Sequence, residues 1–160
     1  MKTKEISNSD DVIDSRDIIA RIDELQAERD ALSDARDEAK ETLDDFSDAI
    51  DMEEREAQQE KLSDAETALT DWDESDEGRE LKALTALQEE AEGYASDWRW
   101  GAALIAEHYF PDYCQELCED IGDLPKDLPH YIVIDWERTA ENIKADYTEV
   151  DFDGTTYLIR

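Results

Sequence analysis

The sequence is poor in basic residues, with 16 Lys and Arg against 47 Asp and Glu among its 160 residues, and its formal net charge is -31. A protein that grips a nucleic-acid backbone needs a basic surface that displaces counterions from the phosphates. We therefore expect no direct contact with nucleic acid and none with an anionic membrane surface. The same imbalance predicts partners that present basic surfaces.

Long apolar runs and cysteines are also scarce. No run reaches the roughly 18 apolar residues of a membrane span, and the segment MKTKEISNSDD lacks the apolar centre of a secretory signal. We expect neither feature, and therefore a cytoplasmic location. The two cysteines, Cys114 and Cys118, are too few for a disulfide framework, so we expect reduced thiols.

Aromatic residues are unevenly distributed, and they divide the chain. Residues 1–93 contain 32 acidic and 11 basic residues but only two aromatic side chains, Phe46 and Trp72, whereas residues 94–160 contain the other eleven aromatics. The main core is therefore expected in the C-terminal part. We predict a mainly α chain with a flexible N-terminus (1–14), an acidic antiparallel helical hairpin of coiled-coil type (15–93) and a small α+β domain (94–160).

The hairpin is predicted from heptad spacing, in which apolar residues alternate at intervals of three and four. The spacing resumes in a new phase after residue 50, so we expect the chain to reverse between Ser47 and Glu54. The first arm would have about 35 residues and span roughly 50 Å, and the returning segment to Gly93 would have about 40 residues with a break at DESDEG. An unbroken helix over 15–72 that pairs with a second chain is the alternative, and the sequence does not decide between them. The first stripe is Ile18, Ile22, Leu25, Arg29, Leu32, Arg36, Ala39, Leu43, Phe46 and Ile50, and the second is Leu62, Ala65, Leu69 and Trp72, followed after DESDEG by Leu81, Leu84 and Leu87.

The C-terminal part shows shorter signals. We expect one helix from Asp97 through Leu104 to His108, and a second from Pro111 to Gly122. The run YIVIDW suggests a short extended segment, after which Asp135 caps a helix that contains Trp136 and Ile143. Residues 148–160 alternate around Asp153-Gly154, a pair typical of a type I′ hairpin turn. This pattern predicts a small α+β domain that ends in a β-hairpin.

Motifs that carry chemistry are weak. Cys114 and Cys118, with His108 and His130, have the residue types of a zinc site or a Cys–His pair, but a buried cysteine in a helix is more often a core residue. The acidic segments lack the residues that complete a calcium loop, and no glycine-rich phosphate loop or nucleophile turn is present. We therefore expect no enzyme, no cofactor and no metal.

The magnitude of the charge suggests a function. Duplex DNA carries one negative charge per roughly 1.7 Å of its axis, so 31 net charges match about 53 Å of duplex. The predicted hairpin has about this length, so its acids could occupy the places of phosphates. An acidic scaffold or assembly protein that binds through its coiled coil is the alternative hypothesis.

The segment from residue 98 to residue 160 resembles the C-terminal domain of ArdA-type antirestriction proteins, and it also looks like antirestriction-type proteins of phages and prophages. The matching features are ELCEDIG at 116–122, LPKDLPHYI at 124–132, IDWERTAENI at 134–143 and DYTEV at 146–150. Residues 1–93 do not match. The resemblance implies a non-catalytic, acidic, dimeric DNA mimic that occupies the DNA-binding groove of a type I restriction-modification enzyme.

We therefore predict a DNA-mimic inhibitor, directed at a type I restriction-modification complex or at another DNA-binding protein such as a CRISPR effector. If a phage encodes the chain, it acts in the cytoplasm of the host cell, and homodimers are expected from the resemblance. Single substitutions of its acids should have small effects because mimicry spreads the binding free energy over many charges. The expected binding acids are Asp112, Glu116, Glu119, Asp120 and Asp123 in the C-terminal domain, and Asp30, Asp34, Asp37, Glu38, Glu41, Asp44, Asp45 and Asp48 in the hairpin.

Overall fold

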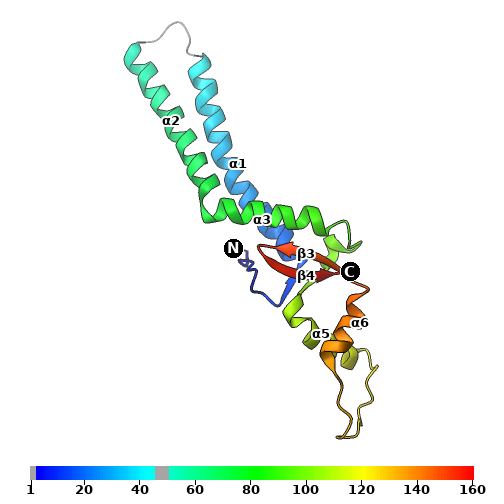
Figure 1. Ribbon diagram of the computed structural model, residues 1–160. Helices are drawn as coiled ribbons and strands as arrows, with labels where there is room; N and C mark the ends of the chain where they lie inside the picture. Colours follow the sequence, from blue (N-terminus) through cyan, green and yellow to red (C-terminus); the bar gives the residue numbers. More distant parts are fainter. Residues whose placement is uncertain (1–2, 46–50) are drawn as a thin grey trace. The chain divides into compact units, whose positions relative to one another are not determined.

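The computed structural model describes residues 3–45 and 51–160. The chain is mainly helical, as expected, and carries a four-stranded antiparallel sheet (Figure 1). None of the helices in the described ranges is long and apolar enough to cross a membrane. The elements are β1 (Val12–Asp14), α1 (Ser15–Asp45), α2 (Met52–Glu74), α3 (Asp76–Ala91), α4 (Trp98–Gly101), β2 (Ala103–Ala106), the 3-10 helix η1 (Glu107–Tyr109), α5 (Phe110–Asp120), α6 (Trp136–Lys144), β3 (Thr148–Phe152) and β4 (Thr155–Ile159).

Two compact units share these elements, and their limits differ from the predicted domains. One unit comprises residues 1–21 with 84–160, and the other comprises residues 22–83. The second half of α3 thus belongs with the C-terminal part, where its residues Leu84 and Leu87 are buried. Helix α3 therefore contributes residues to both units.

The sheet has the strand order β1-β2-β4-β3. Its β3–β4 hairpin is confirmed: Phe152 pairs with Thr155, and Asp153 and Gly154 between them have φ values of 52° and 85°. Positive φ at both central residues is the requirement of a type I′ turn, which glycine and aspartate meet at low cost. The sequence therefore predicted both the position and the type of this turn.

One hydrophobic cluster of the first unit packs helices α5 and α6 against the sheet. Buried Ile105 and Leu158 come from the two central strands, Phe110 and Cys114 from α5, and Ala140 from α6. The predicted cap of α6 is confirmed, since the Asp135 carboxylate accepts a hydrogen bond from the Arg138 backbone N–H at 3.1 Å. This core fixes the orientation of α5, so that the remaining side of α5 faces solvent.

Residues 12–14 are not part of a flexible terminus. They form strand β1, in which Val12 pairs with Ile105, and Ile6 and Ile13 are buried. The Asp14 carboxylate accepts a hydrogen bond from the Arg16 backbone N–H at 2.8 Å and so caps α1. A bond to the Arg16 side chain lowers the pKa of this carboxyl group. The sequence did not predict this strand because it has only three residues in an acidic segment and pairs with a strand that is distant in the sequence.

The helix predicted from Asp97 to His108 is also incorrect. Helix α4 ends at Gly101, whose φ of 119° is outside the helical range, and residues 103–106 form β2. Leu104, Ile105 and Ala106 are buried because β2 is a central strand. A short run that is buried on both faces has no period that distinguishes a strand from a helix.

The run from Tyr131 to Ile134 forms no strand in the described structure. The Ile132 backbone N–H bonds instead to the Pro129 carbonyl oxygen at 2.9 Å, in a turn. Strand-forming residues need a neighbouring edge with which to pair, and the sheet uses other segments for this purpose. The run is therefore part of an exposed connection between α5 and α6.

Tyr157 provides a test of how the N-terminal segment is attached. Its side chain is fully buried, and its hydroxyl donates to the Asp10 carbonyl oxygen at 2.7 Å. We expect Tyr157→Phe to lower the free energy of unfolding by about 1 kcal/mol at neutral pH, because a part-buried hydrogen bond is lost. Urea unfolding followed by circular dichroism measures this change.

The pH dependence of the same variant gives a second readout. Burial raises the pKa of Tyr157 from 10.0 to about 12, so the unfolded state loses this proton first as the pH rises. Stability should therefore decrease between pH 10 and 12, and it should decrease less in Tyr157→Phe. Equal slopes in the two proteins would contradict the burial of this hydroxyl.

Candidate functional site

The predicted acids of the hairpin lie along one side of α1. The seven that the structure describes are all exposed, namely Asp30, Asp34, Asp37, Glu38, Glu41, Asp44 and Asp45. Asp48 lies outside the described residues. At a rise of 1.5 Å per residue, the stretch from Asp30 to Asp45 covers roughly 22 Å of helix. We call these seven residues the α1 acidic face.

The opposite side of α1 contains the predicted stripe. Leu25 is completely buried, and Arg29, Leu32 and Arg36 are half-buried. Within residues 22–45, the stripe includes one residue at every seventh position, namely Ile22, Arg29, Arg36 and Leu43. Because a helix turns about 100° per residue, the side chains one, two and five positions after each of these residues point away from the stripe. The described residues at those positions are nine acids and two alanines. The bases of this segment, Arg29, Arg36 and Lys40, all lie elsewhere on the helix.

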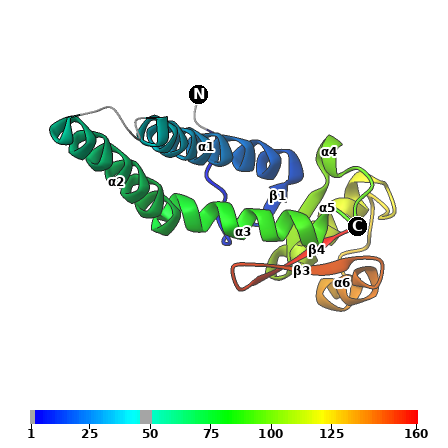
Figure 2. The same ribbon diagram turned by 90° about the horizontal axis from the view of Figure 1, so that it is seen from above.

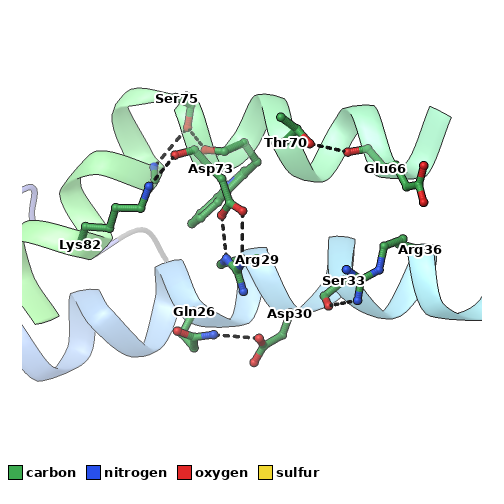
Figure 3. A network of polar contacts seen from close by, with 12 residues as sticks. Gln26, Arg29, Asp30, Ser33, Arg36, Glu66, Thr70, Asp73, Ser75 and Lys82 are labelled. Carbon is green, nitrogen blue, oxygen red and sulfur yellow. Dashed lines mark hydrogen bonds and ion pairs between the residues drawn. The ribbon is translucent and has the colours of Figure 1, made fainter. Parts of the chain in front are cut away.

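The bases on the stripe are engaged in ion pairs. In the unit of residues 22–83, α1 and α2 run in opposite directions (Figures 1 and 2), and the Arg29 guanidinium bonds to both carboxylate oxygens of Asp73, at 2.7 and 3.1 Å. This contact lowers the pKa of Asp73 and raises that of Arg29. Figure 3 shows Arg29 directed toward Asp73, while Asp30 accepts from the amide of Gln26. Arg29 therefore contributes to pairing α1 with α2 and leaves the acidic face negative.

The second predicted group is on α5 and just after it. Asp112, Glu116, Glu119, Asp120 and Asp123 are all exposed, opposite the buried Phe110 and Cys114. Two of the acids have local partners: Glu116 accepts from the Tyr109 hydroxyl at 3.0 Å, and Glu119 accepts from the Gln115 amide at 2.9 Å. The bond to Glu116 raises the pKa of Tyr109. Since neither partner is cationic, the group keeps its full negative charge.

The two acidic groups belong to different compact units. The structure thus brings together the acids within each group. Sequence analysis missed the acids of α2 that also avoid its buried residues Leu62 and Leu69, such as Glu56, Glu60 and Asp64, all of which are exposed. The spacing from those leucines would have identified them.

The zinc and Cys–His hypotheses receive no support from the geometry. The His108 Nε2 lies 2.9 Å from the Asp11 carboxylate, and the His130 ring packs on Tyr131. Among residues 3–45 and 51–160, no three His, Cys, Asp or Glu side chains are placed to share a metal ion. Burial raises the pKa of Cys114 to about 11, which disfavours the thiolate that nucleophilic catalysis needs.

The burial of Cys114 can be tested by thiol labelling. At pH 8 we expect Cys118, which is half-buried, to react with a disulfide reagent much faster than the fully buried Cys114. Both thiols should react in urea, and Cys118→Ser should leave the native protein nearly unreactive. Two rapidly reacting thiols in the native wild type would contradict the burial of Cys114.

No protein-family model, no curated protein and no solved structure matches this chain.

Proposed function

We propose that this protein is a non-catalytic DNA mimic of the antirestriction type, which occludes the basic DNA-binding groove of a defence enzyme. The observation that carries the proposal is the α1 acidic face, where seven exposed acids succeed one another and a single one, Asp37, is paired with a base in the described structure, namely Arg36. An ordinary exposed helix alternates charges of both signs at i and i+4. A surface with charges of one sign lowers the stability of the fold through repulsion, unless a basic partner neutralises it.

The spacing of the acids resembles that of phosphates along DNA, which favours a partner that normally binds duplex DNA. The α1 face alone carries seven charges over roughly 22 Å, or one per about 3 Å, which is close to the 3.4 Å per charge along one DNA strand. Exposed carboxylates at this density can pair with the Lys and Arg side chains that otherwise bind phosphates. The mechanism is competition for one groove, and it requires no reaction.

We also propose that α1 and α2 form an acidic coiled-coil hairpin. Burial of Leu25, Leu62 and Leu69 within a single chain supports this arrangement, as does the Arg29–Asp73 ion pair. The same burial disfavours the scaffold hypothesis, because a scaffold that binds through its stripe would need these leucines for a partner. A scaffold's complexes would also persist in high salt, which does not screen apolar contacts.

A type I restriction-modification complex is the proposed target, on the strength of the resemblance of residues 98–160 to ArdA-type proteins. Another DNA-binding protein, such as a CRISPR effector, would offer the same surface chemistry. Recognition would again depend on a basic groove that normally holds DNA. The acids of α5 supply a second surface for such a groove, and a homodimer would double both surfaces.

Affinity capture tests the proposal. The tagged protein is incubated with bacterial lysate at low salt, and bound proteins are released by a salt gradient or by duplex DNA and identified by mass spectrometry. We expect a DNA-binding complex that both salt and DNA displace. Recovery of partners that do not bind DNA, or that DNA does not displace, would overturn the mimic and favour the scaffold.

A purified type I complex then tests the proposed target. We expect the protein to inhibit its binding of labelled duplex, and raising the duplex concentration should restore binding, as competition requires. If the type I complex is unaffected and another DNA-binding protein is captured, that protein is the target and the competitive mechanism still holds.

A further inference from the structure

The connection between α5 and α6 exposes an unusual amount of apolar surface. Ile121 is 60% exposed, Tyr131 is 76% exposed and Val133 is 88% exposed. In Figure 1 this connection, residues 121–135, is the yellow loop at the lower edge of the view. Contiguous exposed apolar surface on an otherwise polar protein commonly marks a contact with another protein. We call residues 121–135 the apolar loop.

The apolar loop also borders a hollow. Together with the end of α5 and the start of α6, it surrounds a space of about 650 Å³ that is lined mainly by apolar side chains. This volume is within the roughly 300–1,000 Å³ of sites that admit ligands or anchoring side chains. The apolar lining comes from Leu124, Leu128, Ile132, Val133, Ile134 and Trp136. A hollow with such a lining suits an apolar side chain that a partner inserts.

Acids alternate with these apolar residues along the chain. Residues 119–135 contain five acids and one lysine, and all five acids are exposed. Glu119 lines the hollow itself, as does the lysine, Lys126. The five acids are Glu119, Asp120, Asp123, Asp127 and Asp135. A partner that fits both features must combine apolar side chains with basic ones.

We propose that the apolar loop is a docking site for a protein segment in which apolar side chains are flanked by lysine or arginine. Charge complementarity selects this occupant over a second copy of the chain, because a second copy would bring the same five acids to the same place. The contact differs from DNA mimicry in kind. Salt does not screen the apolar part of this contact. The contact also requires apolar side chains, which the basic DNA-binding groove of an enzyme need not present.

Two synthetic peptides test the docking site without any DNA-binding target. One is Lys-Lys-Leu-Phe-Leu-Lys-Lys, and the other is Lys-Lys-Ser-Asn-Ser-Lys-Lys, which has the same charge. Binding to the full chain is measured by fluorescence anisotropy at low salt and at about 0.5 M salt, where surface charge is largely screened. We expect the apolar peptide to bind at least tenfold more tightly than its polar control, and the preference should persist at the higher salt.

Matched variants locate the binding. The triple substitution Tyr131→Ser, Ile132→Ser and Val133→Ser should abolish the preference for the apolar peptide. Trp100→Ser removes a side chain that is 82% exposed outside the apolar loop, and it should leave the preference intact. Thermal unfolding checks that each variant is folded, which we expect because the substituted side chains are exposed.

Three results would overturn the proposal. One is equal affinity for the two peptides, and another is a preference that survives the triple substitution. The third is a wild-type dimer in sedimentation that the triple substitution converts to monomer, because the occupant would then be a second copy. Failure of the affinity capture would leave these measurements unaffected, so the docking site and DNA mimicry are tested separately.

Discussion

Reversing four acids of the α1 acidic face should weaken binding of the target by roughly 10²- to 10⁴-fold near physiological salt, because each reversal both removes a phosphate-like contact and places a cation against the basic groove. The variant is Asp34→Lys, Glu38→Lys, Glu41→Lys and Asp45→Lys. All four side chains are exposed, and lysine is a good helix former, so the helix should persist. Affinity is measured by competition with labelled duplex for the captured target at several salt concentrations.

The control has the same change in charge at other exposed positions: Glu89→Lys, Glu90→Lys, Glu137→Lys and Glu141→Lys. It should lose much less affinity, because its effect is limited to the long-range field. A parallel variant reverses Asp112, Glu116, Asp120 and Asp123 to test the α5 group. An affinity within about threefold of wild type for either test variant would remove that group from the interface.

The exposure of the acids was predictable because it depends on helical geometry alone. Leu25 and Leu32 fix the side of α1 that is withdrawn from solvent, and residues such as Asp34 and Glu41 then face the opposite side. The hairpin turn at Asp153-Gly154 and the cap at Asp135 were predictable for a similar reason. Each depends on one or two residues whose local conformational preference suffices.

The short strands were not predictable because their formation depends on distant partners. Strand β1 has three residues and pairs with β2, which lies about ninety residues further along the chain. Neither strand is long enough to show a period of two. The run Tyr131–Ile134 is the reverse case: its composition predicts a strand, but no neighbouring strand pairs with it in the described structure.

The same limit applies to the candidate sites. The α1 acidic face follows from a local pattern and was found, whereas the apolar loop was missed. Residues such as Val133 appear as core residues in any sequence-based reasoning, because apolar strand formers are usually buried. Only the fold shows that Val133 is 88% exposed and that the adjoining hollow is open. Local charge is therefore easier to read from a sequence than exposed apolar surface.

Neutralising the α1 acidic face should stabilise the protein by roughly 2 kcal/mol at low salt. The variant replaces Asp30, Asp34, Asp37, Asp44 and Asp45 by Asn, and Glu38 and Glu41 by Gln. It removes seven like-charge pairs at i,i+3 or i,i+4, such as Asp34–Glu38, each of which costs about 0.2–0.5 kcal/mol. Helix propensity changes little, because each amide is close to its acid in propensity. The variant also loses the Arg36–Asp37 ion pair and the favourable spacings of Lys40 with Asp37 and Asp44, and each of these offsets a few tenths of a kcal/mol.

Urea unfolding followed by far-UV circular dichroism measures this gain, since guanidinium would itself screen the charges. The difference between variant and wild type should shrink strongly at about 1 M salt, where the Debye length is only about 3 Å. Unchanged or reduced stability of the variant at low salt would contradict repulsion along this face.

The same variant should lose target binding, because amides cannot replace the charge of phosphates. A scaffold that binds through its buried stripe would gain stability and keep its partners. Opposite changes in stability and binding would therefore identify a surface that is kept acidic for recognition and at a cost to the fold.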